Sequence, residues 1–470
     1  MSERRAGDRR LDDRRAADRR SLRARLEAVD LRRVQAGLVG AIAATCLLSI
    51  FAAQLFLALA ALVYLVRIAR RQAPLPRLPL DGPILAFAVW TLLSAAFSPD
   101  PLLSHGSAKK LVLFALLYLA VDTLRDERVR ERVLDAALLG GVVLAAGSVL
   151  QYHFLGFDTL DRRPRSFMGH YMTASGLVMA AMVLAAARAG FGGLRGAKPS
   201  ARDLRAAALL AAALVSVSAL QAADLFAVEG ERLFVAALAA AAVALAVHRG
   251  AWPERSTGAM LALLAFPLCA WALLLSRTRN AWLGAVVGLG VVALMRAPRL
   301  LWLFPAAALA LLVARPAPVM DRLTITDASS RDRYFMWQAG VDMIREKPVF
   351  GQGPRMVENV YPGYRWPGAP NLVTPHLHNN ALQIAAERGL PCLVWWLWWV
   401  AAAVGDAWRE TRRGMTGPRW GAAATVAVVA AVMAAGLFEY NFGDSEILMF
   451  TLIVTALPYA LRSPSPPPAG

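Results

Sequence analysis

The chain has 470 residues, of which 57% are apolar and 18% are charged, and its mean hydropathy is +0.46. An average soluble domain is about 45–50% apolar and about 25% charged. The composition therefore excludes a disordered protein, a soluble nucleic-acid-binding protein and a small disulfide scaffold, and it indicates a polytopic membrane protein. The net charge of +18 does not indicate a nucleic-acid partner, because the basic residues fall between apolar runs, as expected for loops facing anionic lipid.

Residues 1–35 form a polar, arginine-rich segment in which an acidic residue followed by two arginines recurs every five residues between positions 3 and 20. Mixed-sign charge of this density cannot bury a core, so the sequence predicts a solvated tail. The tail is too long and too polar for a cleavable signal peptide. Its arginines favour a cytoplasmic N-terminus.

Apolar runs fill most of the remaining chain. A bilayer core of about 30 Å requires about 20 helical residues, so the run 36–66, which is basic at both ends, is too long for one span and predicts a helical hairpin. Further runs lie at 83–98, 111–124, 133–155, 172–188, 205–224, 232–248, 259–276, 281–296, 300–314, 380–405, 421–438 and 446–461. We therefore predict an all-α bundle of about 12–14 spans, divided into a membrane segment 36–314 and a membrane segment 380–461.

The longest segment between predicted spans is 315–379. With alternating spans, the loops rich in Lys and Arg share one side, which places both termini, including the tail 462–470, in the cytoplasm and the 315–379 loop on the outer side of the membrane. Within this loop, 331–347 has helical periodicity and predicts an amphipathic helix at the outer interface. The stretch 351–376, rich in Gly, Pro and Tyr, predicts an ordered loop.

The predicted spans carry few polar side chains. Asp, Glu and Lys are nearly absent from their centres, which argues against an ion-coupled transporter. Cys46, Cys269 and Cys392 all lie within apolar runs, so we expect neither a disulfide nor a metal site from them. The four tryptophans between 395 and 399 predict an aromatic belt at the cytoplasmic interface rather than a groove for a lipid substrate.

Several arginines on the predicted outer side oppose the charge bias of membrane insertion and need a compensating reason. Arg279 lies between two apolar spans with no acid nearby, and Arg165 lies on a backbone constrained by Pro164 and Gly169. Guanidinium groups bind phosphate oxygens in a bidentate fork and keep their charge, so convergent arginines suit a pyrophosphate. Pairing with local carboxylates is the alternative. The other outer arginines are Arg162, Arg163, Arg277, Arg322, Arg331, Arg333, Arg345, Arg355 and Arg365.

Four polar residues mark the point where the outer loop re-enters the membrane: His376, His378, Asn379 and Asn380. A histidine can take a proton from a hydroxyl group near neutral pH, so a base or sugar-binding role is the leading interpretation over a structural histidine. A metal pair is disfavoured because no cysteine or third histidine is nearby and the outer acids are scattered. His170, beside Arg165, is a weaker candidate. The acidic segment Glu439–Glu446 either pairs with the arginines or contacts sugar.

Four segments resemble the O-antigen ligase and polymerase superfamily of bacterial inner-membrane proteins. They are RPRSFMGHYMTASG (163–176), SRTRNAWLGAVVGLG (276–290), RYFMWQAGVDMI with KPVFGQG (333–353), and HLHNNALQIAAERGLP (376–391). The resemblance covers about 160–455. The His378-Asn379 pair, followed by Gly389 and Leu390, is similar to the ligase pattern, whereas Cys392 stands where a small glycine is usual.

The resemblance implies a GT-C-like fold and a metal-independent, inverting glycosyltransferase without a cofactor. It implies transfer of a glycan from an undecaprenyl-pyrophosphate-linked donor to a lipid A–core acceptor at the periplasmic face, which completes lipopolysaccharide. The partners would be these two substrates and membrane lipids, with no nucleic acid. About twelve spans are usual in the family, so 205–224 and 232–248 are candidates for an insertion.

The resemblance also implies residue roles. Arg165 and Arg279 would stabilise the departing pyrophosphate, and His378 would act as the base on the acceptor hydroxyl. Substrate binding is expected from Arg163, Arg277, Arg331, Arg333, His376, Asn379, Asn380 and His170. The alternatives are an O-antigen polymerase, a protein glycan ligase of the same superfamily, or a lipid-glycan flippase or transporter without catalysis.

Overall fold

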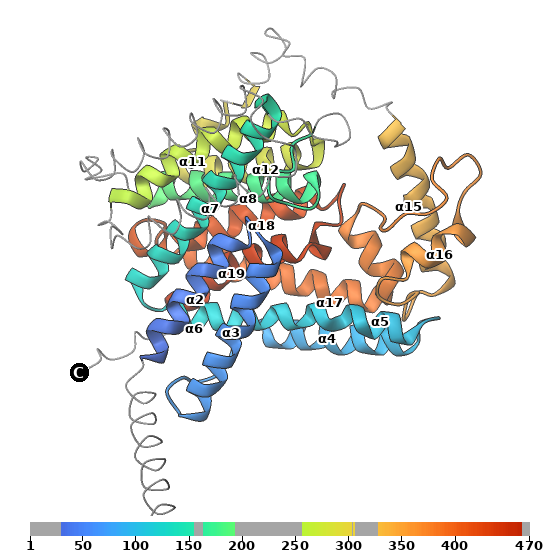
Figure 1. The fold of residues 1–470 in the computed structure, drawn as a ribbon, viewed down its shortest axis with the longest axis horizontal. Helices are drawn as coiled ribbons and strands as arrows, with labels where there is room; N and C mark the ends of the chain where they lie inside the picture. The colour runs from blue at the N-terminus through green and yellow to red at the C-terminus, as the bar shows by residue number, and fades with distance from the viewer. Residues whose placement is uncertain (1–29, 155–162, 193–255, 303, 306–327, 463–470) are drawn as a thin grey trace, which may run out of the picture.

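The computed structural model describes residues 30–154, 163–192, 256–302, 304–305 and 328–462. Throughout these residues the regular structure is helical, without strands (Figure 1). The predicted all-α membrane bundle is thus confirmed for this part of the chain. Nearly all of the arginine-rich tail, the apolar runs 205–224 and 232–248, and most of the run 300–314 lie outside the described residues.

Seven helices in the described ranges are long and apolar enough to cross a membrane. They are α3 (Ile50–Ala69), the continuous stretch Pro101–Thr123, α7 (Glu127–Phe154), α8 (Tyr171–Phe191), Gly258–Leu275 within α11 (Ser256–Leu275), α17 (Asn380–Thr411) and α19 (Ser445–Arg462). The stretch Pro101–Thr123 comprises α5 (Pro101–Ala108), η1 (Lys109–Phe114) and α6 (Ala115–Thr123). Two shorter apolar helices are α4 (Asp81–Ala96) and α18 (Trp420–Ala435). The same part of the chain also contains α2 (Leu31–Thr45), α12 (Arg279–Arg296) and η3 (Pro298–Trp302).

The first two helices form the predicted hairpin. The first begins at Leu31, five residues before the apolar run, because the Asp30 side chain accepts hydrogen bonds from the first backbone N–H groups of the helix. The second helix of the hairpin, α3, ends in basic residues, and these do not simply form a loop that faces lipid. Arg67 is buried and lies 2.6 Å from Asp122 of α6, and it also donates to Gln35 of α2 at 2.7 Å. A buried, hydrogen-bonded ion pair therefore ties the hairpin to the bundle.

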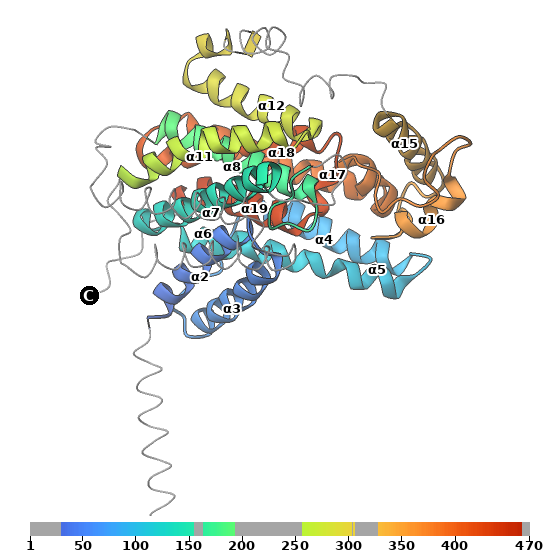
Figure 2. The same cartoon turned by 45° about the horizontal axis from the view of Figure 1, so that its top comes forward.

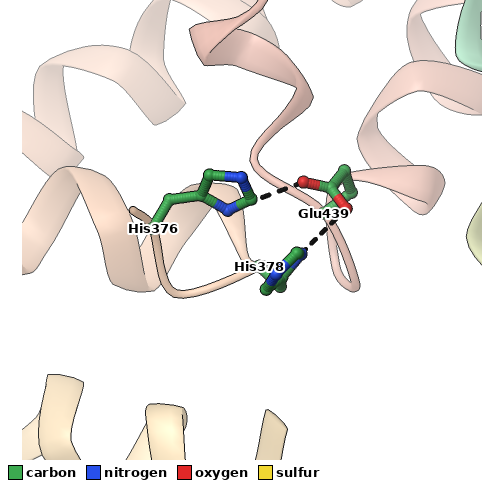
Figure 3. Close-up of side chains that lie close together, drawn as sticks. All are labelled: His376, His378 and Glu439. Carbon is green, nitrogen blue, oxygen red and sulfur yellow. Dashed lines mark hydrogen bonds and ion pairs between the residues drawn. The ribbon is translucent and has the colours of Figure 1, made fainter. Parts of the chain in front are cut away.

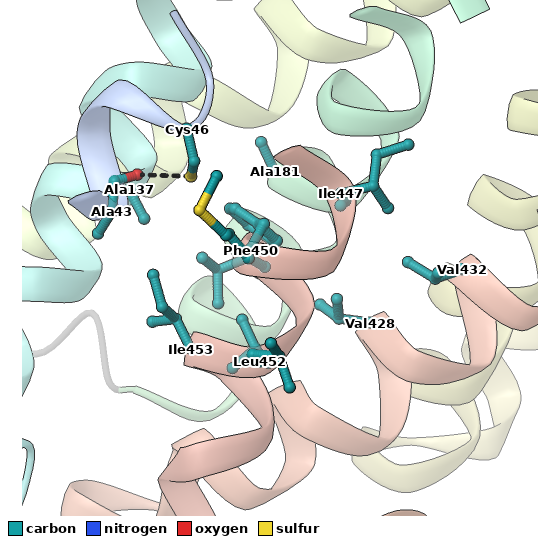
Figure 4. Close-up of a cluster of buried hydrophobic side chains, with 14 of the residues drawn as sticks. Ala43, Cys46, Ala137, Ala181, Val428, Val432, Ile447, Phe450, Leu452 and Ile453 are labelled. Atoms are coloured by element: carbon teal, nitrogen blue, oxygen red, sulfur yellow. Dashed lines mark hydrogen bonds between the residues drawn. The ribbon is translucent and has the colours of Figure 1, made fainter. Parts of the chain in front are cut away.

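Helices α7, α8, α11, α12, α18 and α19 lie side by side in the centre of the molecule (Figures 1 and 2). Small residues permit the close approach of these helices. A Cβ atom at Gly288 of α12 would lie 2.9 Å from the side chain of Ala431 on α18, and one at Gly284 would lie 2.6 Å from the Ala431 carbonyl oxygen. Figure 4 shows the adjoining core, where Phe450 and Ile453 of α19 meet side chains from α2, α7, α8 and α18.

Helix α17 is interrupted at Gly389, where φ is 80° and ψ is 168°. The segment 347–353 is seated in this break: the backbone N–H of Leu390 donates to the Pro348 carbonyl at 2.8 Å, and that of Gly353 donates to the Glu387 carbonyl at 2.8 Å. From α4, the Ser94 hydroxyl donates to the Phe350 carbonyl at 2.6 Å. These hydrogen bonds therefore fix the segment 347–353 to both α17 and α4.

The tryptophan prediction is wrong for two of the four residues. Trp396 and Trp399 are 4% and 3% exposed and pack against Phe442, which follows α18. Only Trp398 is strongly exposed, at 48%. Because successive residues of a helix point about 100° apart, a run of tryptophans occupies both its buried and its exposed face.

The segment 328–379, predicted to lie outside the membrane, contains α15 (Ala328–Glu346) and α16 (Val357–Tyr364). The predicted helix over 331–347 is confirmed, but its apolar side packs on protein rather than lipid: Met336 and Met343 share a small core with Tyr361 and Leu377. The ordered loop predicted at 351–376 includes the short helix α16, whose tyrosines complete this core. This unit lies at one end of the bundle, beside the start of α17 (Figure 1).

Candidate functional site

Three segments far apart in the sequence enclose a cleft of about 260 Å³ at this end of the bundle. The cleft is lined by His170, Tyr171 and Met172 at the start of α8, by Asp332, Arg333 and Met336 on α15, and by Pro375, His376 and His378 before α17. Four of these nine residues, the three histidines and Arg333, are site residues predicted from the sequence. The structure thus brings them into a single cavity.

Glu439, in the connection between α18 and α19, lies against both histidines of the 376–378 segment (Figure 3). Its Oε2 atom is 2.9 Å from Nδ1 of His378, and its Oε1 atom is 3.6 Å from Nδ1 of His376. An ionised carboxylate only accepts hydrogen bonds, so the Nδ1 atom of His378 carries the proton in this pair. In the uncharged form of this imidazole, the other ring nitrogen, Nε2, has the lone pair and can accept a proton.

Burial and charge set the protonation of these groups. Burial raises the pKa of Glu439, but the hydrogen bond from His378 and the electrostatic effects of the two neighbouring histidines together outweigh it and lower the pKa of Glu439 to about 2. Burial lowers the pKa of His376 to about 4, although the Glu439 carboxylate acts in the opposite direction. At neutral pH, Glu439 is therefore ionised and His376 is uncharged.

The backbone at the site is held in an uncommon conformation. His378, Ser166 and Arg277 have φ values of 49°, 51° and 51°, in the left-handed region that non-glycine residues rarely occupy. Such residues cost on the order of 1–3 kcal/mol and cluster at functional sites. Hydrogen bonds hold the backbone at Ser166: the Gln151 side chain on α7 accepts from the N–H groups of Arg165 and Ser166 at 2.8 and 2.7 Å.

The two asparagines after His378 bond to the protein itself. The Asn379 side chain caps α17 by accepting from the Leu382 N–H group, and its Nδ2 atom donates to the Leu437 carbonyl at 2.9 Å. Asn380, 2% exposed, donates to Oδ1 of Asn441 at 2.6 Å. These contacts favour a role in holding the 376–380 segment over the predicted contact with substrate.

Among the predicted arginines, Arg333 is a lining residue of the cleft, whereas Arg163, Arg165, Arg277, Arg279 and Arg331 are not. The guanidinium of Arg163 lies 4.9 Å above the ring of Tyr171, a residue of the cleft wall. Burial lowers the pKa of His170, and the charges of Arg163 and Arg165 act in the same direction. Arg279, the first residue of α12, donates to the Ser330 hydroxyl of α15 at 3.1 Å.

Two predicted arginines are less closely associated with the cleft. Arg277 is directed toward the Tyr152 hydroxyl of α7 at 3.5 Å. Arg331 is exposed on α15 and is not among the residues that line the cleft.

One step in the sequence argument against a metal is wrong. It relied on the lack of a third ligand beside the two histidines, and Glu439 supplies one from 61 residues away. Donor atoms of His376, His378 and Glu439 all lie within 4.8 Å of one another. Equally, the separation of 2.9 Å between Nδ1 of His378 and the carboxylate is that of a direct, charge-assisted hydrogen bond.

The sequence indicated the acidic segment 439–446 as part of the site but left open whether it pairs with the arginines or contacts sugar. The structure shows that Glu439 pairs with imidazoles and not with arginines. Tyr171 and Asp332, which also line the cleft, were not predicted as site residues. The signal that could have found Tyr171 is its position on the 163–176 segment of the family resemblance, beside His170.

Comparison with known proteins agrees with this location. Residues 260–397 match the family model described as O-antigen ligase. The matched region contains Arg279, α15 and both histidines of the 376–378 segment, whereas the Arg163–Tyr171 segment and Glu439 lie outside it. No curated protein sequence matches the chain. Over these residues, less than a third of its length, this multi-pass membrane protein is similar to the O-antigen ligase family.

Proposed function

We propose that the protein is a membrane glycosyltransferase of the O-antigen ligase type. It transfers a glycan from undecaprenyl pyrophosphate to a sugar hydroxyl of the lipid A–core oligosaccharide. The reaction takes place at the periplasmic face of the bacterial inner membrane, and both termini are cytoplasmic. The observation that carries the proposal is a cleft, bordered by the family-matched region, whose wall brings the imidazoles of His378, His376 and His170 together with Arg333.

The leaving group is the diphosphate of the donor. The bond between the anomeric carbon and the phosphate oxygen breaks, and the oxygen keeps the electron pair, so negative charge develops on the diphosphate. Arg165 and Arg279 stabilise this charge, with Arg333 and Arg163 contributing to binding. Preorganised donors of this kind contribute about 2.7–4 kcal/mol each in other enzymes. In this mechanism arginines supply the positive charge, and the reaction needs neither a metal nor a cofactor.

The acceptor is a sugar hydroxyl. Its oxygen attacks the anomeric carbon from the face opposite the diphosphate, which inverts the configuration. Its proton moves to Nε2 of His378, the general base. His376, uncharged at neutral pH because burial lowers its pKa to about 4, can hydrogen-bond to sugar without carrying charge.

The decisive experiment compares a deletion strain with one complemented by the gene. Loss of a ligase removes all O-antigen bands from a lipopolysaccharide gel and leaves lipid-linked glycan to accumulate. A gel that keeps one capped repeat would instead indicate the polymerase. In detergent, the purified protein should join donor glycan to lipid A–core in one step; a transporter would form no covalent product.

A further inference from the structure

The Glu439 carboxylate is the least explained feature of the site. Its side chain is 6% exposed, and each of its oxygens faces one imidazole. Among the residues that the structure describes, its ion-pair partners are these two histidines alone. Burying a carboxylate is unfavourable unless hydrogen bonds and charge compensate for it. The burial of this carboxylate opposite two histidines therefore indicates a role for Glu439 beyond packing.

We propose that Glu439 is a positioning residue for His378. It accepts the Nδ1 proton, which selects the tautomer with a lone pair on Nε2 and sets the plane of the ring. When Nε2 takes the proton of the acceptor hydroxyl, the carboxylate also stabilises the imidazolium that forms. This inference rests on the proposed function, because it assigns a purpose to Glu439 only if His378 is the base.

The chain fixes Glu439 relative to His378 from both sides. The Tyr440 N–H group donates to Oε1 of Glu439 at 3.0 Å, which orients the carboxylate. The Asn380 N–H group donates to the Gly436 carbonyl at 2.8 Å, and the Asn380 side chain accepts from the Phe442 N–H group at 3.0 Å. The loop that carries Glu439 is thus bonded directly to the residues that follow His378.

Gly436 is required for this arrangement. A Cβ atom at this position would overlap the side-chain amide of Asn380. The close contact between the 376–380 segment and the 436–442 loop therefore depends on the absence of a side chain there. Both partners of the His378–Glu439 hydrogen bond are held by interactions outside the bond itself, as preorganisation requires.

Other charged groups face His378, and the experiment must separate their effects. His376 lies on the same segment and His170 precedes α8, while Asp332 and Arg333 project from α15 into the same cleft. Because these groups remain in every variant described next, a change in pH dependence on altering Glu439 reports the lost carboxylate.

The test uses the full-length protein in detergent with the lipid-linked donor and the lipid A–core acceptor. Glu439→Gln should lower kcat about 100-fold, with KM for each substrate within about twofold of wild type, because the reacting groups still bind but the base is misoriented. The acid limb of the pH–rate profile should move to lower pH, since the imidazolium has lost its counter-charge. Glu439→Asp, which keeps the charge, should have a kcat at least tenfold higher than that of Glu439→Gln.

Asp444→Asn is the matched control. Asp444 lies on the same loop and its carboxylate accepts from the Thr173 hydroxyl at 3.0 Å, not from an imidazole. The asparagine oxygen can preserve that bond, so kcat should stay within about twofold of wild type. Thermal unfolding in detergent checks that all variants are folded.

Two results would overturn the inference: wild-type kcat in Glu439→Gln, or a reduced kcat that Glu439→Asp does not recover and that leaves the acid limb in place. The His378→Ala variant distinguishes these from failure of the proposed function. If His378→Ala is inactive and Glu439→Gln is active, only the positioning role is refuted. If His378→Ala keeps wild-type activity, the assignment of the base itself is wrong.

Discussion

At the scale of single residues, the site depends on side chains whose neighbours in sequence do not reveal their partners. His378 and Glu439 meet across 61 positions, and Arg279 reaches Ser330 across 51. The two histidines are separated by one residue yet differ in environment: Nδ1 of His378 lies at hydrogen-bond distance from Glu439, and Nδ1 of His376 lies 0.7 Å farther from it, at 3.6 Å against 2.9 Å. This difference predicts unequal roles.

His378→Ala should therefore reduce transfer by at least 100-fold, and His376→Ala should reduce it less, because only the first removes the base. Initial rates with purified protein measure both. His105→Ala on α5 is a control, since that imidazole is exposed and bonds only to the Pro101 carbonyl within its own helix. Equal activity of the His376 and His378 variants would contradict the base assignment.

Arg165→Ala and Arg279→Ala should each lower transfer by about 100-fold or more while leaving the amount of protein in the membrane unchanged. The reason is lost stabilisation of the departing diphosphate. Arg345→Ala serves for comparison, because this exposed α15 arginine pairs only with Asp342 one turn earlier. Wild-type rates in both site variants would refute the pyrophosphate role.

The cluster of His376, His378 and Glu439 makes the effect of metals worth measuring. EDTA should leave the rate unchanged, because the proposed mechanism places arginines, not a cation, at the diphosphate. Rates are compared before chelation, after it, and after divalent ions are returned. Loss on chelation that one ion restores would assign the three donor atoms to a metal.

At the scale of elements, the break in α17 organises the site. Gly389 and Gly351 both have positive φ, and side chains at either position would collide with the backbone of the opposite segment. The sequence pattern Gly-Leu-Pro at 389–391 predicted no such break, since the apolar run 380–405 continues through it. On either side of the break at Gly389, the backbone of α17 instead forms hydrogen bonds with residues 347–353, which precede α16.

Gly389→Ala should consequently destabilise the protein, because its Cβ atom would overlap the Val349 carbonyl and the φ of 80° is unfavourable for alanine. A fall in the detergent unfolding temperature of several degrees is expected, with loss of activity. Gly405→Ala in the same helix has no atom within 4 Å of the new Cβ and should be neutral or slightly stabilising. Equal unfolding temperatures for the two variants would show that the break is not under steric constraint.

At the scale of the whole molecule, the site lies at one end of the bundle. Helix α17 runs from the cleft at Asn380 to Thr411, so the connection after it is a full span away from α15 and α16. All three native cysteines are free and buried, which leaves little background for cysteine labelling. These two facts make the orientation in the membrane testable.

A membrane-impermeant thiol reagent should label Asn359→Cys on α16 in intact cells, because the extramembrane unit is predicted to face the periplasm. Arg412→Cys, just after α17, should react only once the inner membrane is opened. Both positions are exposed in the folded protein. The reverse pattern would invert the topology inferred from the Lys and Arg distribution.

The local properties of the sequence determined the helical membrane class, the α2–α3 hairpin, the helix at 331–347 and the candidacy of Arg165, Arg279 and His378. These follow from hydropathy, periodicity and charge, which a chain carries wherever its helices pack. Only the tertiary structure decided that Glu439 faces two histidines, that Asn380 is buried in the protein, and that Trp396 and Trp399 belong to the core. The physical reason is that a buried polar group takes whichever partner the packing of distant helices brings within hydrogen-bond reach, and sequence spacing does not encode that packing.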